Sequence, residues 1–370
     1  MNSLFSQEKI NNKRQVELDV AKGIAIIFMI WVHVKEYYMS LVYEGSLYDR
    51  VSEFCGSPPT APVFMLILGI SVHYARNNTY KALAKRGGIL LLISYTLNFI
   101  RDTVPLYIQY RRDGDKEILE ESLYSLVGVD ILTFAGLVFL FLALVKKWNL
   151  NNKEIFVVWC MLCTANILLK AVTLPNQALN VIFAPIWQTY DYSWFPFLSW
   201  FSFPLAGYVL GGYLIRCKDK KIFYKSMAII SGAVSIPLWI YSYFHHVRFG
   251  AFGNLWQDEY YGQDILGNLV LTAFALFWIS MIYFIVPYIP TFIVKILTRW
   301  SKNINRIYCI SYVLLGFGLL VIEGQNWSPL RVSFLAVGFF ILTDIICWIY
   351  EKLLADLQSK QMSLNGAIRQ

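Results

Sequence analysis

The first hydrophobic stretch of the chain carries an ionisable residue near each end. Lys22 precedes the apolar run, His33 follows it, and ten residues lie between them. On an α-helix this spacing amounts to about 16 Å along the axis, so the two side chains would lie near opposite faces of a membrane. Ionisable groups inside an apolar span are costly and usually functional. An imidazole can act as a general base near neutral pH, and an ammonium group can bind an anion such as phosphate.

The composition indicates a protein with many membrane-spanning helices. Of the 370 residues, 57% are hydrophobic and only 15% are charged, whereas soluble domains carry about 25% charged residues. The net charge of +8 does not indicate nucleic acid, because the basic residues gather in alternate connections between apolar segments. We therefore expect a multi-pass protein of the cell membrane (the cytoplasmic membrane if it is bacterial), with membrane lipids around it and no nucleic-acid partner.

Ten apolar segments are suited to cross a bilayer as helices. Their approximate ranges are 18–38, 59–75, 87–106, 125–145, 154–172, 195–215, 226–244, 266–287, 303–322 and 331–350. The connections after the second, fourth, sixth and eighth segments hold sixteen Lys and Arg residues, so the positive-inside rule places them and both termini in the cytoplasm. The prediction is an all-α polytopic membrane protein: a polar segment at 1–17, one bundle of about ten transmembrane helices at 18–350, and a cytoplasmic tail at 351–370.

This topology gathers reactive side chains at the outer face. They are His33, Glu36, Arg101, Asp102, Asp130, His245 and His246. A base, carboxylates that orient it and a cation for developing negative charge are the components of acid–base catalysis. We expect Asp130 to hold the tautomer of His33, and the two later histidines to line an acceptor entrance. The second choices for the orienting role are Glu36, Arg101 and Asp102. Asp130 also has a structural interpretation, because it could cap a helix.

Cations gather at the inner face, where they could bind the phosphates of a nucleotide. They are Lys22, Arg86, Arg299, Lys302 and Arg306. Basic inner connections also satisfy topology and anionic lipids, so that interpretation stays open for all but Lys22, which stands inside an apolar run. Asp344, deep in the last segment, could pair with one of these cations. The C-x-x-C of Cys160 and Cys163 lies in an apolar segment and is expected to pack, not to bind metal.

The order of these motifs resembles a superfamily of multi-span transmembrane acyltransferases. Its two similar branches are the heparan-α-glucosaminide N-acetyltransferase-like proteins and the bacterial membrane proteins that O-acetylate glycans. The residues that carry the resemblance are, in order, Arg14, Glu17-Leu18-Asp19, Lys22-Gly23 and His33; Pro62-Val63-Phe64 and Gly69; Lys85-Arg86; Asp130-Ile131-Leu132 and Gly136; Phe195-Pro196 and Pro204 to Gly212; Ser301 to Asn303 and Ile307-Tyr308. The chain departs from the pattern at Lys22, where the second branch has arginine, and at Ser311, where histidine is frequent.

The resemblance implies that acetyl-CoA, or another acyl-CoA, is the co-substrate and binds from the cytoplasm with its phosphates near the inner cations. The acyl-pantetheine arm would reach outward to His33. That residue would deprotonate a hydroxyl or amine of a carbohydrate or glycolipid acceptor, or accept the acyl group transiently. A proton-coupled transporter or a lipid- or glycan-translocating protein is the alternative, because intramembrane His and Asp can also relay protons. The acceptor, O- against N-acylation, the acyl chain length and assembly as a homo-oligomer stay open.

Overall fold

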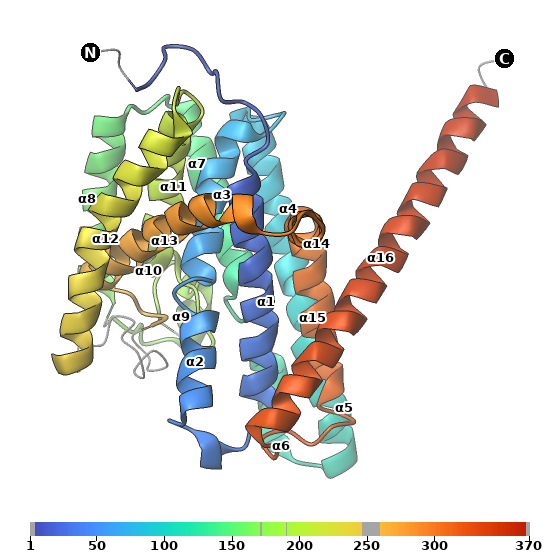
Figure 1. Cartoon of the computed structure of the whole chain (residues 1–370). Coiled ribbons are helices and arrows are strands. Elements are labelled where there is room, and N and C mark those ends of the chain that lie inside the picture. The colour runs from blue at the N-terminus through green and yellow to red at the C-terminus, as the bar shows by residue number, and fades with distance from the viewer. Residues whose placement is uncertain (1–3, 171, 190, 246–259, 368–370) are drawn as a thin grey trace.

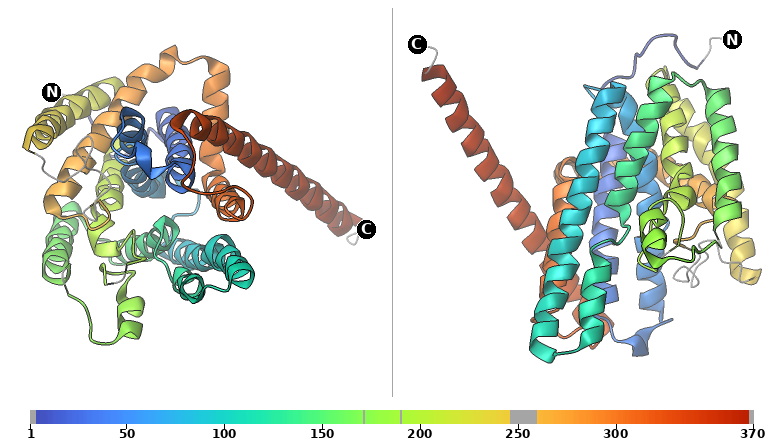
Figure 2. Two further views of the ribbon diagram at one scale, coloured as in Figure 1. Left: turned by 90° about the horizontal axis from the view of Figure 1, so that it is seen from below. Right: turned by 180° about the vertical axis from the view of Figure 1, so that it is seen from behind.

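The computed structural model of the chain describes residues 4–170, 172–189, 191–245 and 260–367. These residues form helices and three isolated bridges, without a regular strand. Figure 1 shows the helices gathered in one bundle, and Figure 2 shows that bundle from below and from behind. The prediction of an all-α protein is confirmed.

The helices follow one another along the chain in a simple order. They are α1 (Val16–Tyr38), η1 (Leu41–Tyr43), α2 (Leu47–Gly56), α3 (Ala61–Tyr74), α4 (Tyr80–Asn98), η2 (Phe99–Thr103), α5 (Val104–Asp113), α6 (Lys116–Ser125), α7 (Ile131–Lys147), α8 (Asn152–Leu169), α9 (Gln177–Phe183), α10 (Phe197–Trp200), α11 (Ser202–Leu214), α12 (Lys220–His245), α13 (Ile265–Ile285), η3 (Val286–Tyr288), α14 (Thr291–Lys302), α15 (Ile304–Gly318) and α16 (Pro329–Ala367).

Six helices in the described part of the chain are long and apolar enough to cross a membrane. They are Leu47–Tyr74, Tyr80–Asp113, Asn152–Leu169, Lys220–Tyr241, Ile265–Tyr288 and Pro329–Gln358. Each of the ten predicted segments overlaps a helix, but α1 carries several charges and others are short. The multi-pass class is therefore supported, while ten spans and cytoplasmic termini stay predictions. Figure 1 places the start of the described chain and the far end of α16 at the same end of the molecule.

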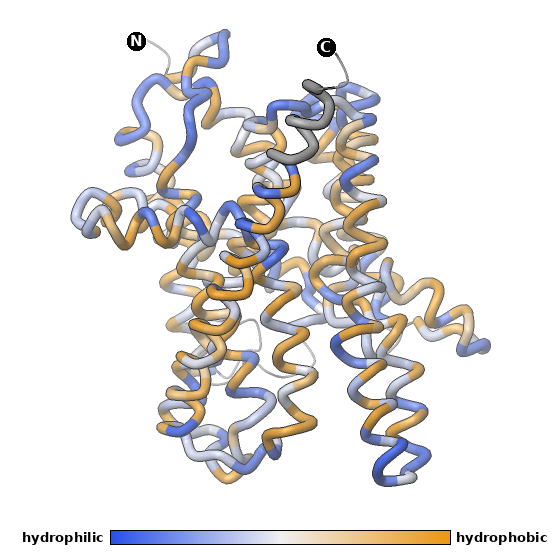
Figure 3. The backbone as a smooth tube through the Cα atoms, turned by 90° about the vertical axis from the view of Figure 1, so that its right-hand side faces the viewer, coloured by the Kyte–Doolittle hydropathy of each residue, from blue (hydrophilic) through white to orange (hydrophobic). Residues whose placement is uncertain are grey.

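Hydropathy follows the helices, as expected for a bundle in lipid. Figure 3 shows hydrophobic residues along most of the long helices and hydrophilic residues gathered near their ends. The last helix, α16, packs against α1 and α15 and then projects away from the bundle, as Figures 1 and 2 show. The segment predicted as a tail continues this helix to Ala367.

Glycines let the central helices approach until their backbones touch, as is common in membrane bundles. A Cβ on Gly69 of α3 would overlap the carbonyl oxygen of Pro204, and one on Gly207 of α11 would overlap that of Leu66. Ser57 to Thr60 separate α2 from α3, and the second predicted segment begins within this turn. Such irregular backbone is tolerated at membrane depth where it lines a cavity.

Candidate active site

A cavity of about 610 Å³ extends along the inside of the bundle. Four helices line it, each with residues at two different heights along the helix axis. The residue pairs are Lys22 and His33 of α1, Ala61 and Ser71 of α3, Asp130 at the N-cap of α7 with Phe139 within that helix, and Ile304 and Tyr312 of α15. Because each pair is separated by about two to three helical turns, the cavity is elongated along the helices. It connects the two ionisable residues of the first apolar stretch, Lys22 and His33.

His33 is hydrogen-bonded through both ring nitrogens. Nδ1 lies 2.7 Å from Oε2 of Glu36, one turn further along α1, and Nε2 lies 2.6 Å from the hydroxyl of Tyr312 on α15. An ionised carboxylate only accepts hydrogen bonds, so Nδ1 carries the proton. The Nε2 lone pair must then accept from the Tyr312 hydroxyl. The network therefore assigns the tautomer in which Nε2 is the basic nitrogen.

Asp130 has different hydrogen-bond partners from the one predicted. Its bonds go to its own helix and to other neighbours, not to His33. Its Oδ1 accepts from the amides of Leu132 and Thr133 at 2.9 and 3.0 Å, so it caps α7. Its Oδ2 accepts from the Tyr308 hydroxyl at 3.1 Å. The prediction that Asp130 holds His33 is therefore wrong, and Glu36, a second choice, makes that contact. The Asp130 oxygens are occupied by the first amides of α7, by Tyr308 and by Arg101.

Arg101 lies in η2, a single π-helical turn between α4 and α5. Its Nε donates to Asp102 at 2.7 Å, and its Nη1 lies 3.5 Å from Oδ2 of Asp130. Its guanidinium carbon lies 4.6 Å from the ring centroid of Tyr312. Gly316 of α15 permits this approach, since a Cβ there would overlap the Arg101 carbonyl oxygen. Single π-turns frequently occur at functional sites, and this one directs a buried cation toward the partner of His33.

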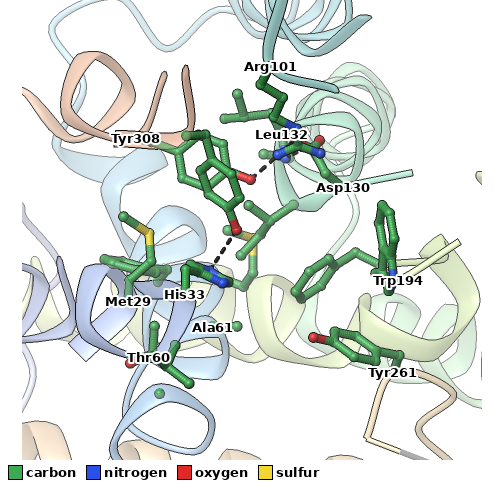
Figure 4. A pocket seen from close by; sticks show the side chains of 18 of the residues that line it. Met29, His33, Thr60, Ala61, Arg101, Asp130, Leu132, Trp194, Tyr261 and Tyr308 are labelled. Carbon is green, nitrogen blue, oxygen red and sulfur yellow. Dashed lines mark hydrogen bonds and ion pairs between the residues drawn. The ribbon is translucent and has the colours of Figure 1, made fainter. Parts of the chain in front are cut away.

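Aromatic side chains form the wall opposite His33. Figure 4 shows Trp194 and Tyr261 across the cavity from the imidazole, with Arg101 and Asp130 on a third side. The amide of Trp194 donates to the carbonyl of Val129 at 3.0 Å, which fixes this loop beside the start of α7. Burial raises the pKa of Tyr261, so its phenol stays neutral. No periodic pattern in the sequence indicates these residues, because they lie in connections between helices.

The inner end of the cavity contains one of the five predicted cations. Lys22 lies 3.6 Å from Asp19, and it lines the cavity with Ser71 and Asn305. The other four predicted cations are not among the described lining residues. They are Arg86, Arg299, Lys302 and Arg306. Arg86 is half-buried and Lys302 is exposed.

Arg299 and Arg306 instead contact the last helix. Arg299 donates to both oxygens of Asp344 at 2.7 Å, which confirms that Asp344 pairs with an inner cation. Arg306 lies 3.6 Å from Glu351. Both side chains are therefore occupied in joining α14 and α15 to α16, and an anionic ligand would have to compete with these carboxylates.

His245 is not brought to His33. His245 is exposed at the end of α12, where its ring stacks on Tyr241 with centroids 4.3 Å apart, and it is not among the described lining residues. His246 lies outside the described residues. Nε2 of His73 donates to the carbonyl oxygen of Tyr208 at 2.9 Å, which is a structural role. Within the described ranges, no group of three or more His, Cys, Asp or Glu side chains could hold a metal ion.

Sequence reasoning missed Tyr312 and undervalued Tyr308. The two rings contact each other in a tilted arrangement with centroids 4.6 Å apart, one turn apart on α15. Their i, i+4 spacing is the available signal, since it places both on one face of a helix. It does not reveal which helix that face meets.

Comparison with known proteins agrees with this geometry. Residues 14–247 match the family described as heparan-α-glucosaminide N-acetyltransferase, catalytic, and this range is more than half of the chain. No curated protein and no solved structure matches the chain. The matched range includes Lys22, His33, Arg101 and Asp130, while Tyr312 lies beyond it. The chain, a multi-pass helical protein, therefore belongs to the heparan-α-glucosaminide N-acetyltransferase catalytic family, an acetyltransferase family.

Proposed function

We propose that the protein transfers an acetyl group from cytoplasmic acetyl-CoA to an amine of a carbohydrate or glycolipid on the outer side of a cell membrane. The observation that carries the proposal is the cavity, which connects Lys22 to His33 along the bundle. The offset of these residues on α1, about 16 Å, is commensurate with an extended acyl-pantetheine arm. Membership of an acetyltransferase family favours this function over proton-coupled transport.

The inner end is suited to the donor. Lys22 supplies a cation inside the cavity, and Ser71 and Asn305 supply hydrogen-bonding groups beside it. Further out, Leu68, Leu90 and Phe139 make the lining apolar, which fits a narrow, largely uncharged arm. Arg86 and Lys302 stay candidates for the phosphates, because neither has an ion pair among the described residues.

The outer end favours an amine over a hydroxyl acceptor. Among the described lining residues there, the carboxylates of Glu36, Asp102, Glu121 and Asp130 outnumber the guanidinium of Arg101. Oε1 of Glu36 is buried and has no hydrogen-bond partner among the described residues, so it can accept from an ammonium group. The aromatic wall opposite, which includes Trp194, offers flat faces on which a sugar ring can stack.

His33 would act as the general base. As the neutral amine nitrogen attacks the thioester carbon, its N–H proton passes to Nε2, and the imidazolium is stabilised by Glu36, 2.7 Å from Nδ1. The C–N bond forms, the C–S bond breaks, and the CoA thiolate takes the proton from Nε2. A route through an acyl-histidine would use the same Nε2 as nucleophile. General base catalysis contributes about 10²- to 10⁴-fold, so His33→Ala should lose at least this factor in kcat.

The test is transfer from radiolabelled acetyl-CoA to a glucosamine-terminated disaccharide, with the purified protein in lipid nanodiscs. His33→Ala should abolish transfer and still bind CoA, because the two ends of the cavity are far apart. Lys22→Ala should weaken CoA binding about 10- to 150-fold, the equivalent of one charge-assisted contact of about 1.5–3 kcal/mol. Lys153→Ala, an exposed lysine at the start of α8, is the control and should change neither property.

Two outcomes would count against the proposal in different ways. If the wild type transferred nothing to the amino sugar, the function would be rejected. If it acetylated the same disaccharide after its amine had been blocked, the amine preference would be wrong and a hydroxyl would be the acceptor.

A further inference from the structure

We propose that the hydroxyl of Tyr312 is a catalytic hydrogen-bond donor that stabilises the oxyanion formed from the thioester carbonyl. The inference rests on the acetyl transfer proposed above. It adds a residue that lies outside the range matching the family and that comes from α15, a helix that packs beside α1 and lines the cavity with it.

The Tyr312 hydroxyl is already hydrogen-bonded to the nitrogen that would act as the base. Tyr312 donates to Nε2 of His33 at 2.6 Å, and a neutral imidazole has a single acceptor lone pair. An acceptor amine that uses His33 as its base must take the position on Nε2 that Tyr312 now holds. Binding of the amine therefore releases the phenolic O–H beside the reacting atoms, at the moment when a donor is required there.

Three contacts hold the phenol ring of Tyr312 in place. Its ring centroid lies 4.8 Å from that of His33 and 4.6 Å from that of Tyr308, and the Arg101 guanidinium lies 4.6 Å from it. A cation against the ring face favours negative charge on the phenolic oxygen and so makes the O–H a stronger donor. A donor that needs no reorganisation during the reaction is what oxyanion stabilisation requires.

Three neighbouring donors are occupied by other groups. The Tyr308 hydroxyl donates to Asp130, and the Thr60 hydroxyl donates to the carbonyl of Cys55. Arg101 pairs with two carboxylates, Asp102 and Asp130. None of these groups would be released by an amine arriving at His33, whereas Tyr312 would be.

The step is balanced without any further reactant. The amine nitrogen forms a bond to the thioester carbon, its proton passes to Nε2, and the carbonyl π electrons move to oxygen, where Tyr312 O–H donates to them. The oxyanion collapses, the C–S bond breaks, and the thiolate leaves with the proton from Nε2. Tyr312 keeps its own proton throughout.

The experiment compares wild type with Tyr312→Phe, which removes the hydroxyl and keeps the stacked ring. We expect kcat to fall about 10²- to 10³-fold, as for the loss of one oxyanion donor, with KM for acetyl-CoA unchanged. Binding of the thioether S-ethyl-CoA, which has no carbonyl oxygen, should be equal in both proteins. Tyr283→Phe removes a hydroxyl of α13 outside the described lining and should leave kcat unchanged.

Each other outcome overturns the inference. A Tyr312→Phe enzyme with wild-type kcat would show that the hydroxyl has no catalytic role. Equal losses in kcat and in S-ethyl-CoA binding would show that it supports the fold of the cavity. If the wild type has no transfer activity, the proposed function is rejected together with this inference. If the wild type is active and Tyr312→Phe is equally active, the inference alone is rejected.

Discussion

Replacing Glu36 with glutamine removes the negative charge beside His33 and changes the size of the side chain very little. In the native protein, Oε2 accepts from Nδ1 at 2.7 Å. The glutamine amide can offer its oxygen, which keeps the tautomer but not the charge. It can also offer its nitrogen, which would require the imidazole proton to move to Nε2 and would remove the base. Both arrangements leave the imidazolium of the transition state less stable.

The size of the effect follows from this single contact. A hydrogen bond to a charged group contributes about 1.5–3 kcal/mol, and its full value applies when the imidazole becomes an imidazolium. At 1.36 kcal/mol per tenfold change in rate, kcat should fall about 10- to 150-fold. KM for acetyl-CoA should not change, because the inner end of the cavity lies about 16 Å away along α1.

The assay is the same nanodisc transfer reaction, with kcat and KM measured separately for each substrate. Glu44→Gln is the matched control, since Glu44 is an exposed carboxylate just beyond the end of α1. The reasoning would be refuted if Glu36→Gln kept wild-type kcat while Asp130→Asn lost it without loss of stability. That pair of results would mean that Asp130, and not Glu36, serves the base.

Two further predictions concern stability and topology. Asp130→Asn should lower the midpoint of thermal unfolding in detergent more than His33→Ala does, because it removes the charge that caps α7 and faces buried Arg101; breaking such a pair costs about 3–5 kcal/mol. Equal midpoints would contradict the structural role of Asp130. In sealed vesicles, a single cysteine at Lys153 should react with an impermeant maleimide from the cytoplasmic side only, and one at Arg112 from the outer side only. Labelling of both from one side would exclude the proposed orientation.

Much of the helical framework can be read from the sequence, because apolar length and local spacing determine it. The contact between His33 and Glu36 is a local i, i+3 relation on one helix, so it needs no tertiary information. The cap at Asp130 is local as well, since a polar residue directly before an apolar run tends to bond to the first amides of the helix. The sequence offered both interpretations of Asp130, and local geometry decides between them.

The remaining features depend on how helices cross, which local patterns do not specify. Tyr312 meets His33 although 279 positions separate them, because α15 packs beside α1. Arg299 pairs with Asp344 of α16, and that partner depends on how α16 crosses α14. Trp194 reaches the cavity from a loop, where no periodicity constrains the side chain.

Two of the carboxylates that line the cavity, Glu36 and Asp130, have different surroundings. Glu36 keeps 25% of its side chain exposed and holds His33, so its charge can follow the protonation of the base. Asp130 keeps only 4% exposed and is committed to the helix cap, Tyr308 and Arg101. Arg101 is thereby neutralised by Asp130 and Asp102 and acts chiefly on the ring of Tyr312 against which it lies. The contacts from Arg101 to Tyr312, His33 and Glu36 therefore join η2, α15 and α1 around one cavity, so that distant parts of the chain orient one imidazole.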